Sequence, residues 1–220
     1  MLKNPIKRFL VLITFISCLT PSCNEQEQAS PDFPDFDIRG IDGSMLAELL
    51  EQNIAFYNLD GDQEDILTIL KNNGINTVRL RLWHSPKTDN SSLEQVSSTA
   101  MKLKERGFKI WLCLHYSDTW ADPSKQTLPQ AWTFLDDAQL TNEVSQYTYS
   151  VVKTIQPDYV QIGNEINNGF LHPKGTLDNY RLFLELIGTC LTSAKSGYAD
   201  CKTIIHLAGH EESFAFINRY

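Results

Sequence analysis

Strand-like and helix-like segments alternate along most of this chain, and the alternation limits the possible folds more than any other feature of the sequence. Short apolar runs predict strands at residues 38–42, 76–83, 109–115, 159–163 and 203–207. Apolar residues at helical spacing predict helices at about residues 45–50, 62–72, 93–106, 144–155 and 177–194. Repeated β-α units of this kind are typical of a parallel sheet covered by helices.

The fold class that we expect is an α/β (β/α)8 TIM barrel, of which only about the first five β/α units are present. A barrel needs eight strands and typically about 250 residues, so this sequence of 220 residues looks truncated. An open doubly wound sheet of five strands is the alternative. Against the alternative, no glycine-rich turn follows the first strand to hold a phosphate, and polar residues recur at the strand ends, as a ring-shaped site would require.

Composition limits the possible partners. With 42% hydrophobic and 21% charged residues, the chain can build one sizeable core, so one domain is expected. The formal net charge of -8 argues against nucleic acids, because binding them requires a basic surface. A neutral ligand fits this charge better.

The N-terminus predicts export. Basic residues precede an apolar stretch in residues 1–22, which is the pattern of a signal peptide. Residues 20–23 resemble a bacterial lipoprotein processing site with Cys23 as the lipidated residue, which would be the only link to a membrane. The usual leucine three positions before the cysteine is missing, so Cys18 and plain secretion are alternatives. Residues 23–35 are expected to be a tether, and residues 36–220 an incomplete barrel domain.

The remaining cysteines have simple interpretations. Cys113 lies in an apolar strand and is expected to be a buried small hydrophobe. Cys190 and Cys201 flank a helix-to-strand connection, so a disulfide between them is an option in an exported protein. No spacing resembles a zinc site, and we expect neither a metal nor a cofactor.

Glu165 is the strongest candidate for a catalytic residue in this sequence. It follows the apolar strand at 159–163 and lies directly after Asn164. Active sites of α/β barrels lie at the C-terminal ends of the strands. A carboxyl group there, beside an amide that can hold a substrate hydroxyl, can protonate a glycosidic oxygen. The competing role, metal ligand, would need further carboxylate or histidine ligands at regular spacing, which we do not find.

The second strand carries two cationic residues on one face. Its period of two places Arg79, Arg81 and Trp83 on one side, opposite Val78 and Leu80. Guanidinium groups that point into a barrel are unfavourable unless they are paired. We expect them to keep the active carboxylates ionised and oriented. The alternative is a structural ion-pair network at the barrel floor.

The third strand ends in a dense set of polar and aromatic groups in residues 115–123. His115, Asp118 and Trp120 offer the hydrogen-bonding partners and aromatic faces to which sugar rings bind. Trp120 could instead pack under a long loop, and Asp122 before Pro123 could only form a turn.

Three further groups of residues have open interpretations. Asp42 and Ser44 end the first strand, where they could cap a helix or contact a substrate. His206 ends the fifth strand and would face the mouth of a barrel. The other histidines are expected to be solvated: His84, His172 and His210.

Taken together, segments 79–83, 115–123 and 163–166 resemble glycoside hydrolase family 53, the arabinogalactan endo-β-1,4-galactanases. The similarity runs in order from about residue 37 to the end and includes Gln126, Pro129 and Trp132. The run of residues 116–123 is specific to this family, whereas an Asn-Glu pair occurs in many retaining barrel glycosidases.

The resemblance implies an enzyme that cuts β-1,4-galactan or arabinogalactan internally with retention of configuration. Glu165 would be the acid/base, Asn164 would hold the sugar 2-hydroxyl, and Arg79 and His115 would surround the reacting subsite. The nucleophile of the family is a second glutamate at the end of strand seven, a part that we do not find in this sequence. We therefore expect the polypeptide as given to be inactive and the complete enzyme to be active. Alternatives are another retaining barrel glycosidase, such as an endo-mannanase or a β-galactosidase, and a surface lipoprotein that binds glycan without cleaving it.

Overall fold

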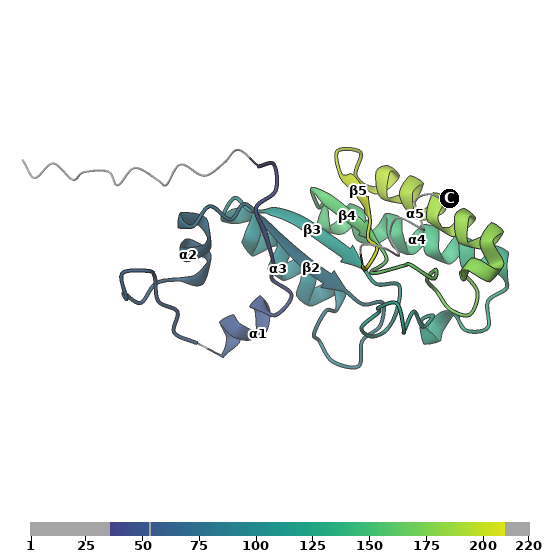
Figure 1. The fold of residues 1–220 in the computed structure, drawn as a ribbon, viewed down its shortest axis with the longest axis horizontal. Helices are drawn as coiled ribbons and strands as arrows, with labels where there is room; N and C mark the ends of the chain where they lie inside the picture. The colour runs from purple at the N-terminus through teal and green to yellow at the C-terminus, as the bar shows by residue number, and fades with distance from the viewer. Residues whose placement is uncertain (1–35, 53, 210–220) are drawn as a thin grey trace, which may run out of the picture. The chain divides into compact units, whose positions relative to one another are not determined.

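The described part of the chain is a parallel sheet with helices along one face (Figure 1). The structure is a computed structural model of the 220-residue chain and describes residues 36–52 and 54–209. The expected signal peptide and tether, with Cys18 and Cys23, lie outside the described residues, as does His210.

Five strands pair in the order in which they occur in the sequence, β1-β2-β3-β4-β5, and every pairing is parallel. Their bounds are Gly40–Asp42 for β1, Thr77–Leu82 for β2, Lys109–Leu114 for β3, Tyr159–Ile162 for β4 and Lys202–Ile205 for β5. All five predicted strands are confirmed within two residues. The sequential order contains no reversal, whereas a doubly wound sheet has one, so the doubly wound alternative is wrong.

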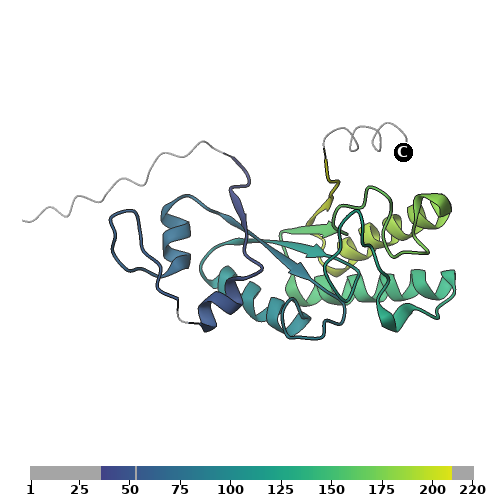
Figure 2. The same ribbon diagram turned by 60° about the horizontal axis from the view of Figure 1, so that its bottom comes forward.

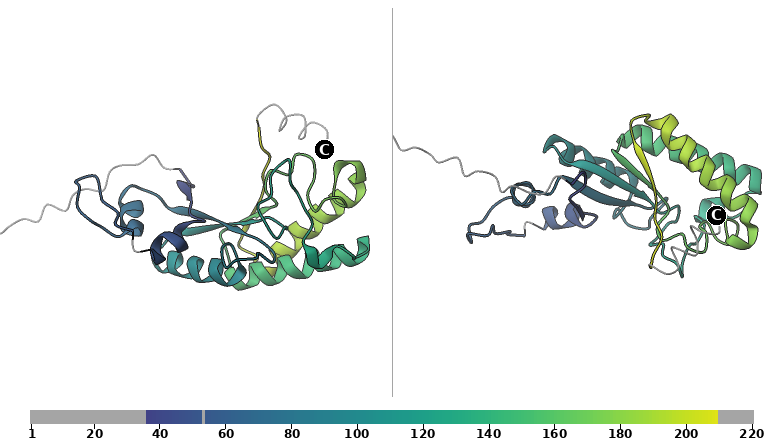
Figure 3. Two further views of the ribbon diagram at one scale, coloured as in Figure 1. Left: turned by 90° about the horizontal axis from the view of Figure 1, so that it is seen from below. Right: turned by 45° about the horizontal axis from the view of Figure 1, so that its top comes forward.

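Helices connect these strands on the outer face of the sheet. The helices are α1 (Leu46–Glu51), α2 (Ile66–Asn72), α3 (Leu93–Glu105), α4 (Asp137–Ile155) and α5 (Tyr180–Gly197). Short 3-10 helices precede α4 and α5: η1 (Gln130–Trp132) and η2 (Leu177–Asn179). Figures 2 and 3 show α3, α4 and α5 side by side along one face of the strands. This is the layering of a β/α barrel wall.

Side-chain capping sets where several helices begin. Asp65 accepts a hydrogen bond from the backbone N–H of Thr68, so α2 begins at Ile66 and not near residue 62 as the sequence predicts. Ser92 caps α3 in the same way. Asp136 and Gln139 form a reciprocal capping box at the start of α4.

Alternation along the strands separates a core face from a polar inner face. Val78, Leu80 and Leu82 of β2 are buried toward the helices, which confirms the predicted period of two. Opposite them, Arg79 and Arg81 point to the inner face. The core residues of β3 and β4 follow the same rule: Ile110, Leu112, Leu114, Val160 and Ile162. Each such side chain stabilises the fold by about 1.5–3 kcal/mol when it is fully buried.

The cysteines of the described region are all free thiols. Cys113 is buried in β3, as expected. Cys190 and Cys201 are buried too, but no disulfide joins them, so that option is not realised. Burial raises the pKa of the Cys190 thiol to about 12. Among the described helices, none has the length and apolar character that crossing a membrane requires.

Candidate active site

Polar residues from all five strands gather at one edge of the sheet, because the C-terminal ends of parallel strands lie together. Asp42 ends β1, Trp83 and His115 directly follow β2 and β3, and His206 directly follows β5. Asn164 and Glu165 follow β4 after one glycine. The chain turns sharply there: Gly163 has φ of 67° and Glu165 has φ of 55°. A left-handed backbone is rare for glutamate, so neighbouring residues must hold this turn.

Arg79 of β2 connects β1, β3 and β4 to its own strand at this edge, and its bond to β3 runs from Nη2 to Cys113 Sγ over 3.0 Å. Its Nη1 lies 2.7 Å from Asp42 Oδ2, and its Nη2 donates to Asn164 Oδ1 over 2.9 Å. Its Nε donates to Gln161 Oε1 over 3.1 Å. The predicted guanidinium is therefore paired, and it reaches the residue that precedes Glu165.

Asn164 is buried, and its amide orientation is fixed from both ends. Its Oδ1 accepts from Arg79 and lies 3.3 Å from Gln161 Nε2. Its Nδ2 donates to the carbonyl of Ala121 over 2.8 Å. An amide nitrogen carries two hydrogens, so the second N–H of Asn164 can serve a substrate oxygen.

Gln161 is a member of this hydrogen-bond network that sequence reasoning missed. It is buried on β4, where its Oε1 accepts from Arg79 Nε and from Trp111 Nε1, the latter over 3.1 Å. Its Nε2 donates to the carbonyl of Gly163 over 2.7 Å. A glutamine inside an otherwise apolar strand was the signal that could have pointed to it.

Asp42 is an ion-pair partner at the site. Its carboxylate accepts from the backbone N–H of Ser44 over 3.1 Å and lies 3.6 Å from Arg81 Nη2. Partial burial acts to raise the pKa of Asp42, but the hydrogen bonds from Ser44 and the charges of Arg81 and Arg79 outweigh it and lower that pKa. The helix-cap alternative does not hold, because the N-cap of α1 is Met45 and no side chain caps it.

His115 is a neutral imidazole with one defined tautomer. Burial, followed by the charges of Arg79 and Arg81, lowers the pKa of His115 to about 3. Its Nδ1 accepts the backbone N–H of Ala121 over 3.0 Å. The ring proton therefore sits on Nε2, and His115 can donate from that atom.

Trp120 lies beside this histidine with 41% of its surface exposed. The centre of its ring is 4.7 Å from the guanidinium carbon of Arg81 and 5.5 Å from the ring of His115. A partly exposed indole beside a cation can stack on the C–H face of a sugar. Packing under a loop, the alternative for Trp120, would have buried it more completely.

Three N–H groups on neighbouring residues are buried without an acceptor among the described residues: Arg81 Nε, Trp83 Nε1 and His115 Nε2. The rings of Trp83 and His115 lie 6.5 Å apart. Buried donors are normally paired. A ligand with several oxygen acceptors would match this set of donors.

Asp118 bonds to backbone groups of two loops. Its two oxygens accept the backbone N–H groups of Ser85, over 3.0 Å, and of Gln130, over 2.8 Å. It therefore ties the β2–α3 loop to the β3–α4 loop. Asp122 accepts hydrogen bonds from the backbone N–H and the side-chain hydroxyl of Ser124. These local bonds agree with the alternative that Asp122 forms a turn.

The expectation that His84 is solvated is wrong. Its side chain is only 15% exposed, and its ring packs against Trp132 at 4.5 Å and Tyr147 at 4.9 Å between ring centres. Its Nδ1 lies 3.5 Å from Asp118 Oδ1. Burial lowers the pKa of His84, and the charge of Asp118 opposes that shift. The loop fold that brings these residues together could not be read from the sequence.

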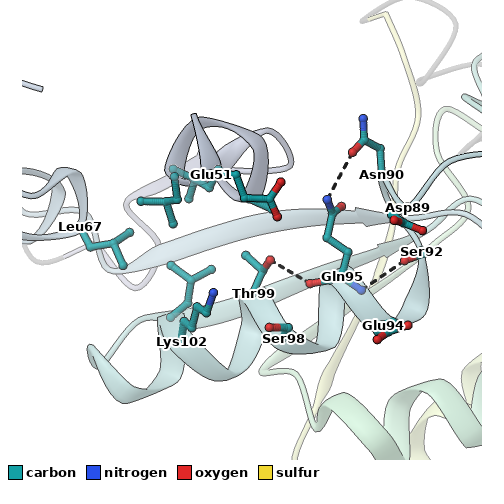
Figure 4. Close-up of a pocket in the computed structure, with 14 residues that line it drawn as sticks. Glu51, Leu67, Asp89, Asn90, Ser92, Glu94, Gln95, Ser98, Thr99 and Lys102 are labelled. Atoms are coloured by element: carbon teal, nitrogen blue, oxygen red, sulfur yellow. Dashed lines mark hydrogen bonds between the residues drawn. The ribbon is translucent and has the colours of Figure 1, made fainter. Parts of the chain in front are cut away.

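A cavity of about 600 Å³ lies elsewhere, between α1 and α3 on the helix side of the sheet (Figure 4). Its lining includes Glu51, Gln95, Thr99 and Lys102, and none of the predicted site residues. For the described ranges, no group of three or more His, Cys, Asp or Glu side chains is placed to hold a metal ion.

Residues 38–218 match the model of Glycosyl hydrolase family 53. The chain belongs to this family. It is 39% identical to a probable arabinogalactan endo-beta-1,4-galactanase A of Aspergillus fumigatus over 180 residues, which are 77% of this chain and 49% of that protein. The chain spans about half the length of the curated relatives it matches.

Solved structures of the family are similar to this chain in fold. The family 53 catalytic domain of Ignisphaera aggregans is 38% identical with a TM-score of 0.79, over 86% of this chain and 57% of that one. A fungal beta-1,4-galactanase is 33% identical with a TM-score of 0.73, over 78% of this chain and 53% of that one. The described residues therefore form five consecutive strands of a (β/α)8 barrel with the helices that connect them, which confirms the predicted fold class.

Proposed function

We propose that this family 53 chain carries the acid/base half of a retaining endo-β-1,4-galactanase that acts on galactan or arabinogalactan. The observation that supports the proposal most is the Asn164-Glu165 pair at the end of β4, where Arg79 bonds to Asn164 over 2.9 Å. The similarity to a relative named as a probable galactanase supports the substrate class.

The proposed reaction has two steps. In the first, a carboxylate attacks the anomeric carbon while Glu165 donates its proton to the departing glycosidic oxygen. In the second, Glu165 accepts a proton from water, which then hydrolyses the glycosyl-enzyme intermediate. The two carboxyl groups must lie about 5–5.5 Å apart. The family resemblance assigns the nucleophile to a glutamate at the end of strand seven, beyond the five strands described.

The surrounding residues have matching roles. Asn164, fixed by Arg79 and Gln161, would donate its remaining N–H to the sugar 2-hydroxyl. His115 is neutral, so it would offer an Nε2–H to a sugar oxygen without adding charge. The exposed face of Trp120 would stack on a sugar ring.

The test uses the complete enzyme, by which we mean a protein that contains residues 36–209 within an entire eight-stranded barrel. Glu165→Gln should reduce the release of reducing ends from galactan by about 10²–10⁴-fold, because the general acid is lost. Glu105→Gln, at the exposed end of α3, is the matched control and should leave activity unchanged. Full activity in Glu165→Gln would refute the proposal.

A substrate panel separates the rival enzymes. Cleavage of mannan, or of terminal galactosides only, would replace galactanase by endo-mannanase or β-galactosidase. Calorimetry that finds galactan affinity in a wild-type protein that releases no reducing ends would favour a glycan-binding lipoprotein instead.

We also propose that the protein is exported and anchored by a lipid on Cys23. The basic and apolar residues before Cys23 support this proposal. Cys23→Ser should move the protein from the membrane fraction to the soluble fraction, whereas Cys18→Ser should not. The reverse result would assign the anchor to Cys18, and a wild-type protein found in the soluble fraction would indicate plain secretion.

A further inference from the structure

We infer that Gln126 is a positioning residue, which holds the backbone of Glu165 so that the carboxyl group lies where it can protonate the leaving oxygen. The inference rests on the proposed acid/base role of Glu165. Gln126 lies on the β3–α4 loop and is 3% exposed. It acts through main-chain atoms of the β4–α5 loop.

Glu165 needs such support because its backbone is left-handed. The φ of 55° at Glu165 is a conformation that persists in a non-glycine residue only when the surroundings enforce it. The preceding Gly163, with φ of 67°, begins the same turn. Without outside bonds the turn would relax, and the carboxyl group would move with it.

The amide of Gln126 binds this turn directly. Its Nε2 donates to the carbonyl oxygen of Asn164 over 2.6 Å and to that of Glu165 over 3.3 Å. Carbonyl oxygens only accept, so the nitrogen of this amide must face them. The Oε1 atom of Gln126 is buried and has no partner within residues 36–52 and 54–209.

Gln126 is itself held by the loop that it supports. Its backbone carbonyl accepts the N–H of His172 over 2.6 Å, and Leu128 N–H donates to the carbonyl of His172 over 3.1 Å. The side chain of Gln126 is thus fixed against the start of the β4–α5 loop while its backbone is fixed against a later part. With both its backbone and its amide bonded to the β4–α5 loop, Gln126 can keep the start of that loop in place.

His206 holds the opposite side of the turn. Its backbone carbonyl accepts the N–H of Ile166 over 3.1 Å. Its Nδ1 lies 3.1 Å from Asn164 Oδ1 and 3.3 Å from the backbone nitrogen of Glu165. Gln126 therefore fixes carbonyl groups of the turn, and His206 fixes the N–H of Ile166. A catalytic group must be held within about 0.5 Å of its working position, and a misplacement of about 1 Å can reduce the rate by about 100-fold.

The test compares Gln126→Met with wild type in the complete enzyme, because methionine has a similar size but no donor. Two substrates are used: galactan, whose leaving oxygen needs a proton, and a 2,4-dinitrophenyl β-galactobioside, whose leaving group departs without one. We expect kcat/KM on galactan to fall by about 100-fold. On the activated substrate, we expect kcat/KM to change by less than about threefold, because nucleophilic attack is unaffected.

A matched control and a second variant make the result decisive. Gln146→Met, on the exposed side of α4, should leave both kcat/KM values unchanged. If Gln126→Met does not fold, Gln126→Glu has the same shape and decides the question. Its carboxyl can donate one hydrogen bond when protonated and none when ionised, so its galactan activity relative to the activated substrate should fall as the pH rises.

Equal losses on both substrates, or no loss on galactan, would overturn the inference, since a residue that only stabilises the fold does not distinguish leaving groups. A wild-type enzyme that does not cleave galactan, or a fully active Glu165→Gln, would instead refute the proposed function. The two failures are therefore distinguishable.

Discussion

Arg79 Nη2 lies 2.9 Å from Asn164 Oδ1, and this bond joins the second strand to the residue beside the proposed acid/base. The same guanidinium bonds to Asp42 and Gln161. No other described side chain connects β1, β2 and β4 through hydrogen bonds in this way. We therefore expect the hydrogen bonds of Arg79 to stabilise the fold as well as to orient Asn164.

Arg79→Met should destabilise the complete enzyme by about 2–3 kcal/mol, because it removes charged hydrogen bonds and leaves the side-chain oxygens of Gln161 and Asn164 with one donor fewer each. Urea unfolding measures the free energy of unfolding. The control is Arg106→Met, whose ion pair with Asp65 is exposed and should be worth less than about 1 kcal/mol. Equal effects of the two substitutions would contradict the role assigned to Arg79.

His115 should make stability depend on pH. The ordinary pKa of histidine is 6.5, and in the folded protein burial and the charges of Arg79 and Arg81 lower the pKa of His115 to about 3. Between these values the unfolded chain binds a proton that the folded protein does not, so stability falls as the pH drops from 6.5 toward 3. Asp42 opposes this shift, and His206 adds to it.

His115→Asn keeps an acceptor for the N–H of Ala121 and removes the titration. Its free energy of unfolding should therefore fall less steeply than that of wild type between about pH 6.5 and pH 4.5, by at most about 1.4 kcal/mol per pH unit. Urea midpoints of both proteins across this range give the two slopes. Parallel slopes would show that the imidazole does not titrate as we expect.

Asp118 allows a test between two roles. The sequence predicts a substrate contact, whereas its oxygens accept the N–H groups of Ser85 and Gln130. Asp118→Asn loses one of these bonds, so we expect a destabilisation of about 1–2 kcal/mol with little change in KM for galactan. Thermal unfolding and steady-state kinetics of the complete enzyme measure the two quantities. An unchanged stability together with a raised KM would instead support the predicted substrate contact of Asp118.

A polypeptide limited to residues 24–220 should release no galacto-oligosaccharides from galactan. Retention requires two carboxyl groups about 5–5.5 Å apart, and the resemblance places the second one on a seventh strand. The assay is product analysis by chromatography, with the complete enzyme at the same concentration as the positive control. Oligosaccharide release by residues 24–220 would mean that another carboxylate serves as nucleophile.

The same polypeptide should also be poorly stable. β1 and β5 are the outermost strands of the described sheet, and unpaired strand edges favour association between chains. Light scattering after size exclusion should detect aggregates, and thermal unfolding should be broad. A monomer with a sharp cooperative transition would contradict this expectation.

The sequence was sufficient to predict the strands and the place where the site residues meet. Buried strands are recognisable in the sequence as short apolar runs. The parallel topology alone brings Asp42, Asn164 and His206 to one edge of the sheet. The alternation in β2 was also predictable, because one face of a strand must be apolar to pack on helices. Local patterns therefore determined most of the fold.

Loop residues were harder to predict, since their partners are distant in the sequence. Asp118 bonds to Ser85, 33 positions away, and Gln126 bonds to Asn164, 38 positions away. His84 is buried by Trp132 and Tyr147, which reach it only once the β3–α4 loop has folded. No period or spacing in the sequence reports such contacts.

At Glu165, the left-handed backbone favours one kind of residue and the proposed acid/base role requires another. A protein designer who considered the main chain alone would choose glycine or asparagine there. Such a replacement would ease the turn while it removed the proposed acid, so directed evolution for heat resistance alone would tend to lose the proposed activity before the fold.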